Sequence, residues 1–198
     1  MVLKYGLLLI SYLVGAIPFS VILGIKLKGI DVREHGSGNP GGTNSLRYLG
    51  KRVGLLVIFF DILKGAIFVI LTKYILPDSL DLLHPLAYGF AATIGHVFSV
   101  YIKFRGGKAV ATGGGMIIAF NPLVAIVAAL GFFITLKLSK YVSLASTMAA
   151  VTMFVTTLFL GDFWFSFFGG ITMLVVIYRH KVNYQNIRAG KERKVYWM

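Results

Sequence analysis

Residues 36–47, GSGNPGGTNSLR, combine the residue types that bind a phosphate group. Glycines such as Gly38 allow backbone N–H groups to converge on an anion, because glycine adopts conformations that are closed to other residues. Arg47 adds a planar charged fork that matches two phosphate oxygens. Loop 36–47 is therefore predicted to bind an anionic substrate. The hydroxyl and amide side chains that add to its donors are Ser37, Asn39, Thr43 and Asn44.

A second polar stretch contains the run RGGK at positions 105–108. Lys108 supplies a point charge, and Gly106 and Gly107 place unobstructed backbone donors beside it. Thr112 follows at the expected start of a helix, where the helix dipole favours anions. This stretch predicts a second phosphate cradle.

Two more polar stretches occur later in the chain, at residues 140–146 and 178–192. The first of them offers the hydroxyl of Ser143 as a hydrogen-bonding group. In the second, His180 and Asn183 are three residues apart, so they share a face if the preceding helix continues through them. These side chains are expected to complete the same anion site.

The elements that must position these groups are membrane helices. The chain has 198 residues, of which 57% are hydrophobic and 14% charged, and its mean hydropathy is +0.81. Such a composition excludes an ordinary soluble domain. The absence of cysteine excludes disulfides, a thiolate nucleophile and cysteine-ligated metal.

A membrane-spanning helix needs about 20 mostly apolar residues. The apolar segments are residues 5–27, 53–76, 82–102, 109–136, 142–160 and 163–178. The dipeptide Asn121-Pro122 interrupts the fourth segment, because proline lacks an N–H group and disfavours a helical residue before it. Division there gives seven transmembrane helices, of which residues 109–120 form a short one. We therefore expect an all-α polytopic integral membrane protein, folded as a single domain over residues 1–198.

The distribution of Lys and Arg sets the expected orientation, because basic loops stay on the cytoplasmic side. With seven helices and the N-terminus outside, most of the 20 basic residues fall inside the cell together with the C-terminus. With six helices, the basic tail and the Lys137/Lys140 pair would lie outside. Seven helices place all four polar stretches on the cytoplasmic face.

Other interpretations of these residues were weighed. Residues 36–41 match GxGxxG but follow a membrane helix rather than a strand, and RGGK lacks the remaining residues of a Walker loop. Asp61 and Lys64 are expected to form a mutually neutralising structural pair within a helix. His96 suits a buried hydrogen-bonded imidazole or a catalytic one. The histidines lack metal-ligand spacing and no Ser-His-Asp pattern is visible, so neither a metal nor a protein nucleophile is predicted.

At these residues the chain resembles the bacterial acyl-phosphate:glycerol-3-phosphate acyltransferases, the PlsY family, over nearly its whole length. The family pattern GSGNxGATN followed by arginine is met at positions 36–44 and Arg47, with Gly42 in place of the alanine. The pattern GHxFPxFxxFKGGKGVAT is met from Gly95 to Thr112, with Ser99 in place of the proline, Arg105 in place of the first lysine and Ala109 in place of the third glycine. The YVSL segment and the terminal RHxxN…GxE pattern also recur. The residues that carry these last two are Tyr141, Ser143, Leu144, Arg179, His180, Asn183, Gly190 and Glu192.

The resemblance implies an enzyme of phospholipid synthesis at the bacterial inner membrane. It would transfer a fatty acyl group from acyl phosphate to the sn-1 hydroxyl of glycerol-3-phosphate, giving 1-acyl-glycerol-3-phosphate and phosphate, without acyl-CoA, a cofactor, a metal, nucleic acid or a protein partner. The expected catalytic residues are Ser37, Arg47, Lys108, His180 and Asn183. The expected substrate-binding residues are Gly38, Asn39, Thr43, Asn44, His96, Gly106, Gly107, Thr112 and Ser143.

A good leaving group on the acyl donor makes a covalent enzyme intermediate unnecessary, so direct attack by the glycerol hydroxyl is expected. Either His180 or substrate phosphate can accept its proton. The alternative function is a membrane transporter of phosphorylated metabolites, which predicts polar groups at the bilayer midplane and related halves. A lipid-phosphate hydrolase is a third hypothesis, disfavoured because no nucleophile is paired with a base.

Overall fold

The computed structural model describes residues 2–195, which contain α-helices and short 3₁₀ and π turns but no β-strand. The contacts between Cα atoms divide the chain into two compact units, Met1–Phe120 and Asn121–Met198. The first unit contains α1 (Val2–Ala16), α2 (Phe19–Lys28), α3 (Gly42–Tyr48), α4 (Lys51–Ile70), α5 (Pro85–Val97) and α6 (Val110–Phe120). The second contains α7 (Pro122–Ser139), α8 (Val142–Phe159), α9 (Phe163–Arg179) and α10 (Lys181–Arg188).

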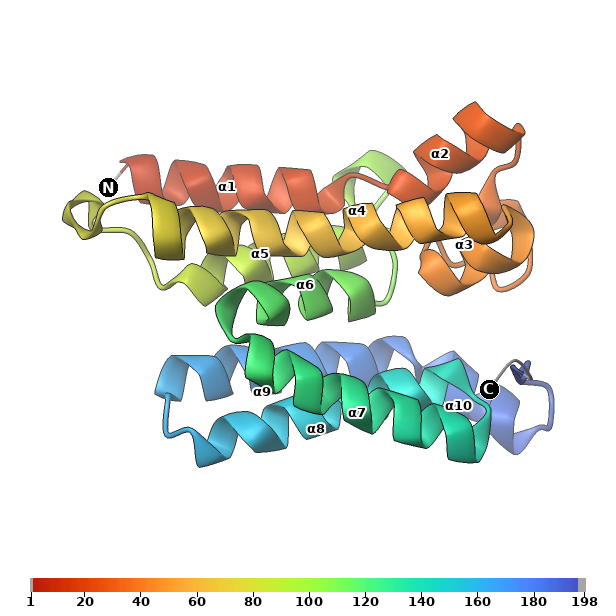
Figure 1. Cartoon of the computed structure of the whole chain (residues 1–198). Helices are drawn as coiled ribbons and strands as arrows, with labels where there is room; N and C mark the ends of the chain where they lie inside the picture. The colour runs from red at the N-terminus through yellow and green to blue at the C-terminus, as the bar shows by residue number, and fades with distance from the viewer. Residues whose placement is uncertain (1, 196–198) are drawn as a thin grey trace. The chain divides into compact units, whose positions relative to one another are not determined.

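In the first unit, α1 packs on α5, and α4 packs on both α5 and α6. Successive long helices run in opposite directions, as Figure 1 shows for α1, α4, α5 and α6. Loop 36–47 and the connection from α5 to α6 therefore both lie toward the end that carries α3, away from the N-terminus (Figure 1). The fold brings the first two polar stretches to one end of this unit, as the sequence predicts.

Glycines allow these helices to approach closely. A side chain at Gly15 or Gly95 would collide with the backbone across the α1–α5 contact, and one at Gly65 or Gly115 would collide with the backbone across the α4–α6 contact. Small residues at such positions are typical of helix packing in membranes. Gly115 of α6 thus serves close packing against α4.

Two of the expected membrane helices are broken. The segment 5–27, expected as one helix, is α1 and α2 with a bend of 40° between them. Pro18 lies at this break, where it cannot donate the N–H that a continuous helix needs. At the other end of the chain, α9 and α10 are bent by 47°. His180 stands at this second break, so the expected helix running through His180 and Asn183 is wrong.

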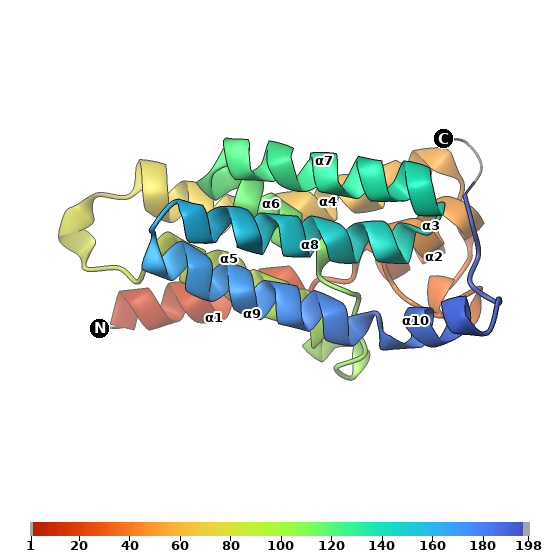
Figure 2. The ribbon, with the colours of Figure 1, turned by 90° about the horizontal axis from the view of Figure 1, so that it is seen from below.

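The second unit is a layer of long helices in which α7 packs on α8 and α8 on α9, with α10 continuing beyond α9 (Figure 2). Its first residue, Asn121, caps α7 by accepting a hydrogen bond from the N–H of Val124 at 3.2 Å. Pro122 occupies the first helical position, where its missing N–H costs nothing. The helix break predicted at this dipeptide is confirmed.

Several helices have the length and composition of membrane spans. They are Lys51–Ile75, Pro85–Ile102, Pro122–Ser139 and Val142–Phe159, and the two bent pairs raise the number of candidates to six among the described residues. Large apolar side chains such as Leu123, Leu138 and Phe159 are 73%, 81% and 86% exposed. Such exposure suits lipid rather than water, so the chain is an all-helical integral membrane protein.

Candidate active site

Loop 36–47 is built around the side chain of Asn44. This amide is 3% exposed, and its Nδ2 donates to the backbone carbonyls of Val32 at 3.0 Å and His35 at 2.9 Å. Its Oδ1 accepts from the backbone N–H of Ser37 at 3.4 Å. Both ends of the amide are therefore engaged within the protein. These bonds indicate that Asn44 holds the loop in place, and its direct contact with substrate stays a prediction.

Apart from Ser45, which is buried, the remaining polar side chains of the loop are exposed or half-buried. Ser37, Thr43 and Arg47 are exposed, and Asn39 is half-buried with its N–H directed at the Ser37 hydroxyl at 3.4 Å. Thr43 and Arg47 are four residues apart in α3 and so share one face of that helix. Gly38 holds the preceding turn at a φ of 66°, which favours glycine. The loop thus presents a hydroxyl pair and a guanidinium to solvent.

A second arginine near the loop is already paired. Arg33 binds Asp31 with its Nη2 at 2.5 Å from Oδ2, and this contact holds the pKa of the Asp31 carboxyl below its usual value. The pair neutralises Arg33, so Arg47 is the better source of positive charge for a ligand at this loop.

The turn 105–108 does not form the expected cradle of N–H groups. Gly106 donates its N–H to the carbonyl of Val97 and Gly107 donates to that of His96, each at 3.0 Å. These bonds satisfy carbonyls at the end of α5, which a helix end leaves open. A side chain at Gly106 would collide with the His96 carbonyl, and one at Gly107 with the His96 ring. The two glycines therefore shape the turn that precedes Lys108 rather than donate to phosphate.

Thr112 lies at the contact between α4 and α6. It is fully buried, and its carbonyl faces Gly65 of α4 so closely that no side chain fits between them. Its hydroxyl has no hydrogen-bond partner among residues 2–195. The tight α4–α6 contact thus gives Thr112 a role in packing, and its expected role in binding substrate stays a prediction.

His96 belongs to a buried polar cluster that the sequence showed only in part. The predicted pair of Asp61 and Lys64 is confirmed, with 2.7 Å between Oδ1 and Nζ. His96 joins them, its Nδ1 lying 3.6 Å from the same Asp61 oxygen. The cluster lines a small cavity that has about 10 Å³ for the centre of a water-sized molecule, about enough for one water. Other lining residues include Pro40, Gly106 and Gly107.

In the second unit the expected residues converge on a carboxylate that was not among the predicted site residues. Glu192 Oε1 accepts from the Ser143 hydroxyl at 2.9 Å and from Asn183 Nδ2 at 2.7 Å. These three side chains are named the Glu192 cluster below. Glu192 stands in the terminal RHxxN…GxE pattern, so the signal was present in the sequence. Only the fold shows that it joins α8 to the segment after α10.

His180 and Tyr184 lie on either side of Asn183 along the chain. His180 is 3% exposed, and its Nδ1 lies 2.8 Å from the carbonyl of Val176. That bond orients the imidazole ring. The Tyr184 hydroxyl lies 2.6 Å from that of Thr147, which ties α10 to α8. Sequence patterns gave no indication of this hydroxyl pair.

The fold and these polar loops define an integral membrane protein with side chains suited to anionic substrates. A family model described as glycerol-3-phosphate acyltransferase matches residues 5–190. A glycerol-3-phosphate acyltransferase of Bacillus cytotoxicus is 43% identical over 98% of this chain and 96% of its own length. One from Staphylococcus aureus strain Newman is 41% identical over 97% and 98%.

Solved structures agree with these relatives. The crystal structure of PlsY, an integral membrane glycerol 3-phosphate acyltransferase, in its glycerol 3-phosphate form is 36% identical, with a TM-score of 0.89 over 98% of this chain and 96% of that one. The lysophosphatidic acid form gives 35% identity and a TM-score of 0.86 over 98% and 95%. This chain belongs to the glycerol-3-phosphate acyltransferase family, which confirms the resemblance to PlsY, and it is an acyltransferase.

Proposed function

We propose that this enzyme transfers a fatty acyl group from acyl phosphate to the sn-1 hydroxyl of glycerol-3-phosphate. The observation that carries the proposal is the set of cationic and hydroxyl groups that the first unit gathers at one end. They are the exposed side chains of loop 36–47 and Lys108, the last residue of turn 105–108. Two phosphorylated substrates need such a concentration of positive charge. The glycerol 3-phosphate and lysophosphatidic acid forms of the related PlsY structures support the acceptor and the product.

The reaction proceeds by direct attack. The acceptor oxygen forms a bond to the acyl carbon, the bond between that carbon and the phosphate oxygen breaks, and inorganic phosphate leaves with the electron pair. Arg47, Lys108 and Ser37 hold the phosphates, since binding energy that fixes two reactants together replaces a large entropic barrier. Asn39, Thr43 and the Gly38 turn add contacts in loop 36–47. His96, Gly106 and Gly107 contribute by shaping the turn that carries Lys108.

The second unit contributes the remaining groups. Ser143 and Asn183 donate hydrogen bonds to a phosphate or to the oxyanion that develops on the acyl carbon. His180 orients the acceptor, and its Nε2 or a phosphate oxygen of the substrate receives the hydroxyl proton. The leaving phosphate needs no further activation, so neither acyl-CoA, a metal nor a protein partner takes part.

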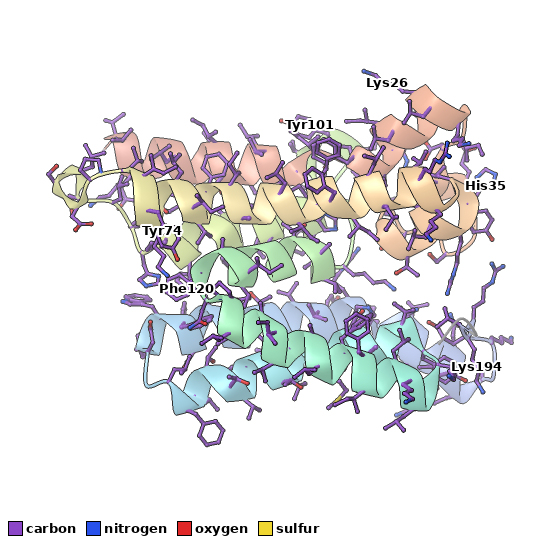
Figure 3. All side chains as sticks on the ribbon, in the orientation of Figure 1. Lys26, His35, Tyr74, Tyr101, Phe120 and Lys194 are labelled. Carbon is purple, nitrogen blue, oxygen red and sulfur yellow. The ribbon has the colours of Figure 1, made fainter. Side chains whose placement is uncertain are left out.

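The whole chain, residues 1–198, works as one domain with seven crossings of the bacterial inner membrane. Its N-terminus is outside and its C-terminus and active site face the cytoplasm, which agrees with the basic residues of the connecting loops. The short α6 is the fourth crossing in chain order and raises the total from six to seven. Lys73 donates to the carbonyl of Phe120 at 2.5 Å and the Tyr74 hydroxyl to that of Ala119 at 3.3 Å. Figure 3 shows Tyr74 and Phe120 at the end of the first unit opposite His35.

Those two hydrogen bonds support the proposed topology. A helix end leaves carbonyls that lipid cannot satisfy, and side chains from the π turn after α4, residues Leu71–Ile75, satisfy two of them at the end of α6. A helix of 11 residues can therefore end short of the membrane surface.

The test uses the purified full chain in detergent with a chelator present. It receives glycerol-3-phosphate with either acyl phosphate or acyl-CoA, and the lipid product and released phosphate are measured. We expect one phosphate released per acyl group transferred from acyl phosphate and no transfer from acyl-CoA. Transfer from acyl-CoA alone would refute the donor, and loss of activity on chelation would refute metal independence. No transfer from either donor would favour transport instead.

A further inference from the structure

The middle of α4 carries two charges that the reaction proposed above does not use. Asp61 and Lys64 are 2% and 3% exposed, and their ion pair is 2.7 Å long. Removing two charges from water costs more than their attraction returns unless further hydrogen bonds satisfy them. The other contacts of this pair therefore indicate what it does.

On one side, Lys64 contacts the break between α1 and α2. Its Nζ donates to the carbonyl of Ile17 at 3.0 Å and lies 5.7 Å from the ring centre of Phe19. The hydroxyl of Ser99 donates to the neighbouring carbonyl of Ala16 at 2.5 Å. A broken helix leaves such carbonyls without their regular partners. Two distant side chains thus hold this bend from the side of the cavity.

On the other side, Asp61 faces His96, with 3.6 Å between Oδ1 and Nδ1. That distance suits an electrostatic contact rather than a hydrogen bond. The ring of His96 packs against Gly107 so closely that no side chain fits there, and the His96 carbonyl accepts the N–H of Gly107 at 3.0 Å. The contacts that begin at Ile17 therefore end at the residue before Lys108.

We propose that Asp61 and Lys64 are positioning residues for the acyl transfer. The pair fixes the α1–α2 bend and the imidazole of His96 in one arrangement, and His96 in turn fixes the turn 105–108 that aims Lys108. Lys64 touches neither substrate and acts through Lys108. This inference rests on the proposed function, in which Lys108 binds a substrate phosphate.

The test compares Lys64→Met with Lys73→Met. Both lysines extend from the same continuous span, residues 51–75, and each donates to a carbonyl of another helix end, Ile17 at 3.0 Å and Phe120 at 2.5 Å. They differ in that Lys73 lies at the opposite end from turn 105–108. For equal amounts of folded enzyme, Lys64→Met should lower kcat/KM about 10- to 100-fold, as displacement of a catalytic group does. Lys73→Met should stay within about twofold of wild type.

The substrate whose KM changes distinguishes a positioning role of Lys64 from a role in stability alone. Lys64→Met should raise the KM for the same substrate whose KM rises in Lys108→Arg, and combining the two changes should cost less than the product of the separate losses. Equal losses from Lys64→Met in the wild-type and Lys108→Arg backgrounds would overturn the proposal. So would equal effects of Lys64→Met and Lys73→Met. Wild-type enzyme that fails to transfer the acyl group refutes the proposed function instead.

A second variant covers the case in which Lys64→Met fails to fold. Asp61→Leu combined with Lys64→Met removes both buried charges, a change that is often neutral or stabilising for folding. This double variant should be folded, as judged by size-exclusion chromatography and thermal unfolding in detergent, but should keep the raised KM. Full activity of the double variant would show that the charges serve only each other. Its failure to fold would equally overturn the proposal, which requires a folded, slower enzyme.

Discussion

Loop 36–47 and the Glu192 cluster hold their polar side chains in different ways. In the loop, one buried amide, Asn44, binds two backbone carbonyls and leaves Ser37 and Arg47 exposed. In the Glu192 cluster, the side chains proposed to bind substrate are themselves bound to a carboxylate, at 2.9 and 2.7 Å. In the loop, Asn44 holds the backbone in place, while Ser37 and Arg47 remain exposed for contact with substrate. The cluster assigns both tasks to the same groups.

The two regions differ in which hydrogen bonds must be given up before a substrate binds. Side chains of the loop can meet a phosphate without giving up a partner. The Ser143 hydroxyl must exchange the one bond it donates to Glu192 before it donates to a substrate oxygen, and a charged acceptor makes that bond stronger than a neutral one. The Asn183 amide has two N–H donors, so one of them can stay on Glu192. Substitutions in the loop should separate binding from stability, whereas substitutions in the cluster should change both.

The largest effect is expected for Arg47→Ala. Removal of a donor aimed at developing or bound negative charge costs about 10²- to 10³-fold in rate, and Arg47 is exposed, so thermal unfolding should be unchanged. Arg47→Lys should fall between wild type and alanine, because lysine keeps the charge but not the planar fork. Steady-state kinetics on detergent-purified enzyme gives kcat/KM. A matching fall in melting temperature would contradict the difference between loop 36–47 and the Glu192 cluster, since it would make Arg47 a structural residue.

Asn44→Ala should instead act mainly on stability. It leaves the carbonyls of Val32 and His35 without their donor, which costs about 1–3 kcal/mol for buried groups. Activity should fall with the fraction of ordered loop. Asn44→Asp keeps the acceptor for Ser37 but loses both donated bonds, so it should resemble alanine. Thermal unfolding with and without glycerol-3-phosphate measures both. If Asn44→Ala unfolds like wild type but binds substrate poorly, Asn44 contacts substrate directly and the comparison fails.

A smaller effect on both properties at once is expected for Glu192→Gln. The amide oxygen can still accept a hydrogen bond, but a neutral acceptor gives about 1 kcal/mol less than a charged one, and partial exposure of Glu192 reduces this further. We expect a modest fall in melting temperature together with a fall in kcat/KM of no more than about fivefold, since tenfold would need about 1.4 kcal/mol. Ser143→Ala gives the comparison for stability only, because it removes one of the two bonds and leaves the charge, while its loss of activity includes the loss of a proposed donor to substrate. A loss of activity without any loss of stability would place Glu192 in the chemistry itself.

Features whose cause lies in neighbouring residues could be predicted from the sequence. The break at Asn121-Pro122 follows from proline and a capping amide, and the pairing of Asp61 with Lys64 follows from a spacing of three residues in a helix. The prediction that loop 36–47 binds phosphate likewise depends on the loop's own composition, and it stays a prediction. For such features a short stretch of sequence contains most of the physical cause.

Features whose cause lies in distant residues were missed. Proline at position 18 was visible, but the break there depends on Lys64 and Ser99, which are 47 and 83 residues away from the carbonyls they bind. Glu192 meets Ser143 across 49 residues. The N–H groups of Gly106 and Gly107 are used by carbonyls at the end of α5, and nothing in the run RGGK reveals that competition.

The smallest effect is expected at Ala109, directly after turn 105–108, where this chain departs from the family's glycine. Ala109 has a φ of 68°, and an alanine in this left-handed region costs about 1–2 kcal/mol. Ala109→Gly removes that strain, but it also loses a buried methyl group worth about 0.8 kcal/mol and raises the entropy of the unfolded chain by about 0.4–1 kcal/mol. These contributions nearly cancel, so the melting temperature should hardly move.

Gly107→Ala, two residues earlier, is the matched substitution that should be destabilising. Gly107→Ala drives a methyl group into the ring of His96, so it should lower both melting temperature and kcat/KM, whereas Ala109→Gly should keep kcat/KM within about twofold of wild type. Thermal unfolding and kinetics on the two variants side by side provide the measurement. A large gain in activity from Ala109→Gly would show that the strained alanine holds Lys108 away from its best position. Tolerance of Gly107→Ala would show that contact with His96 does not set the turn, and that Lys108 is aimed from the α6 side alone.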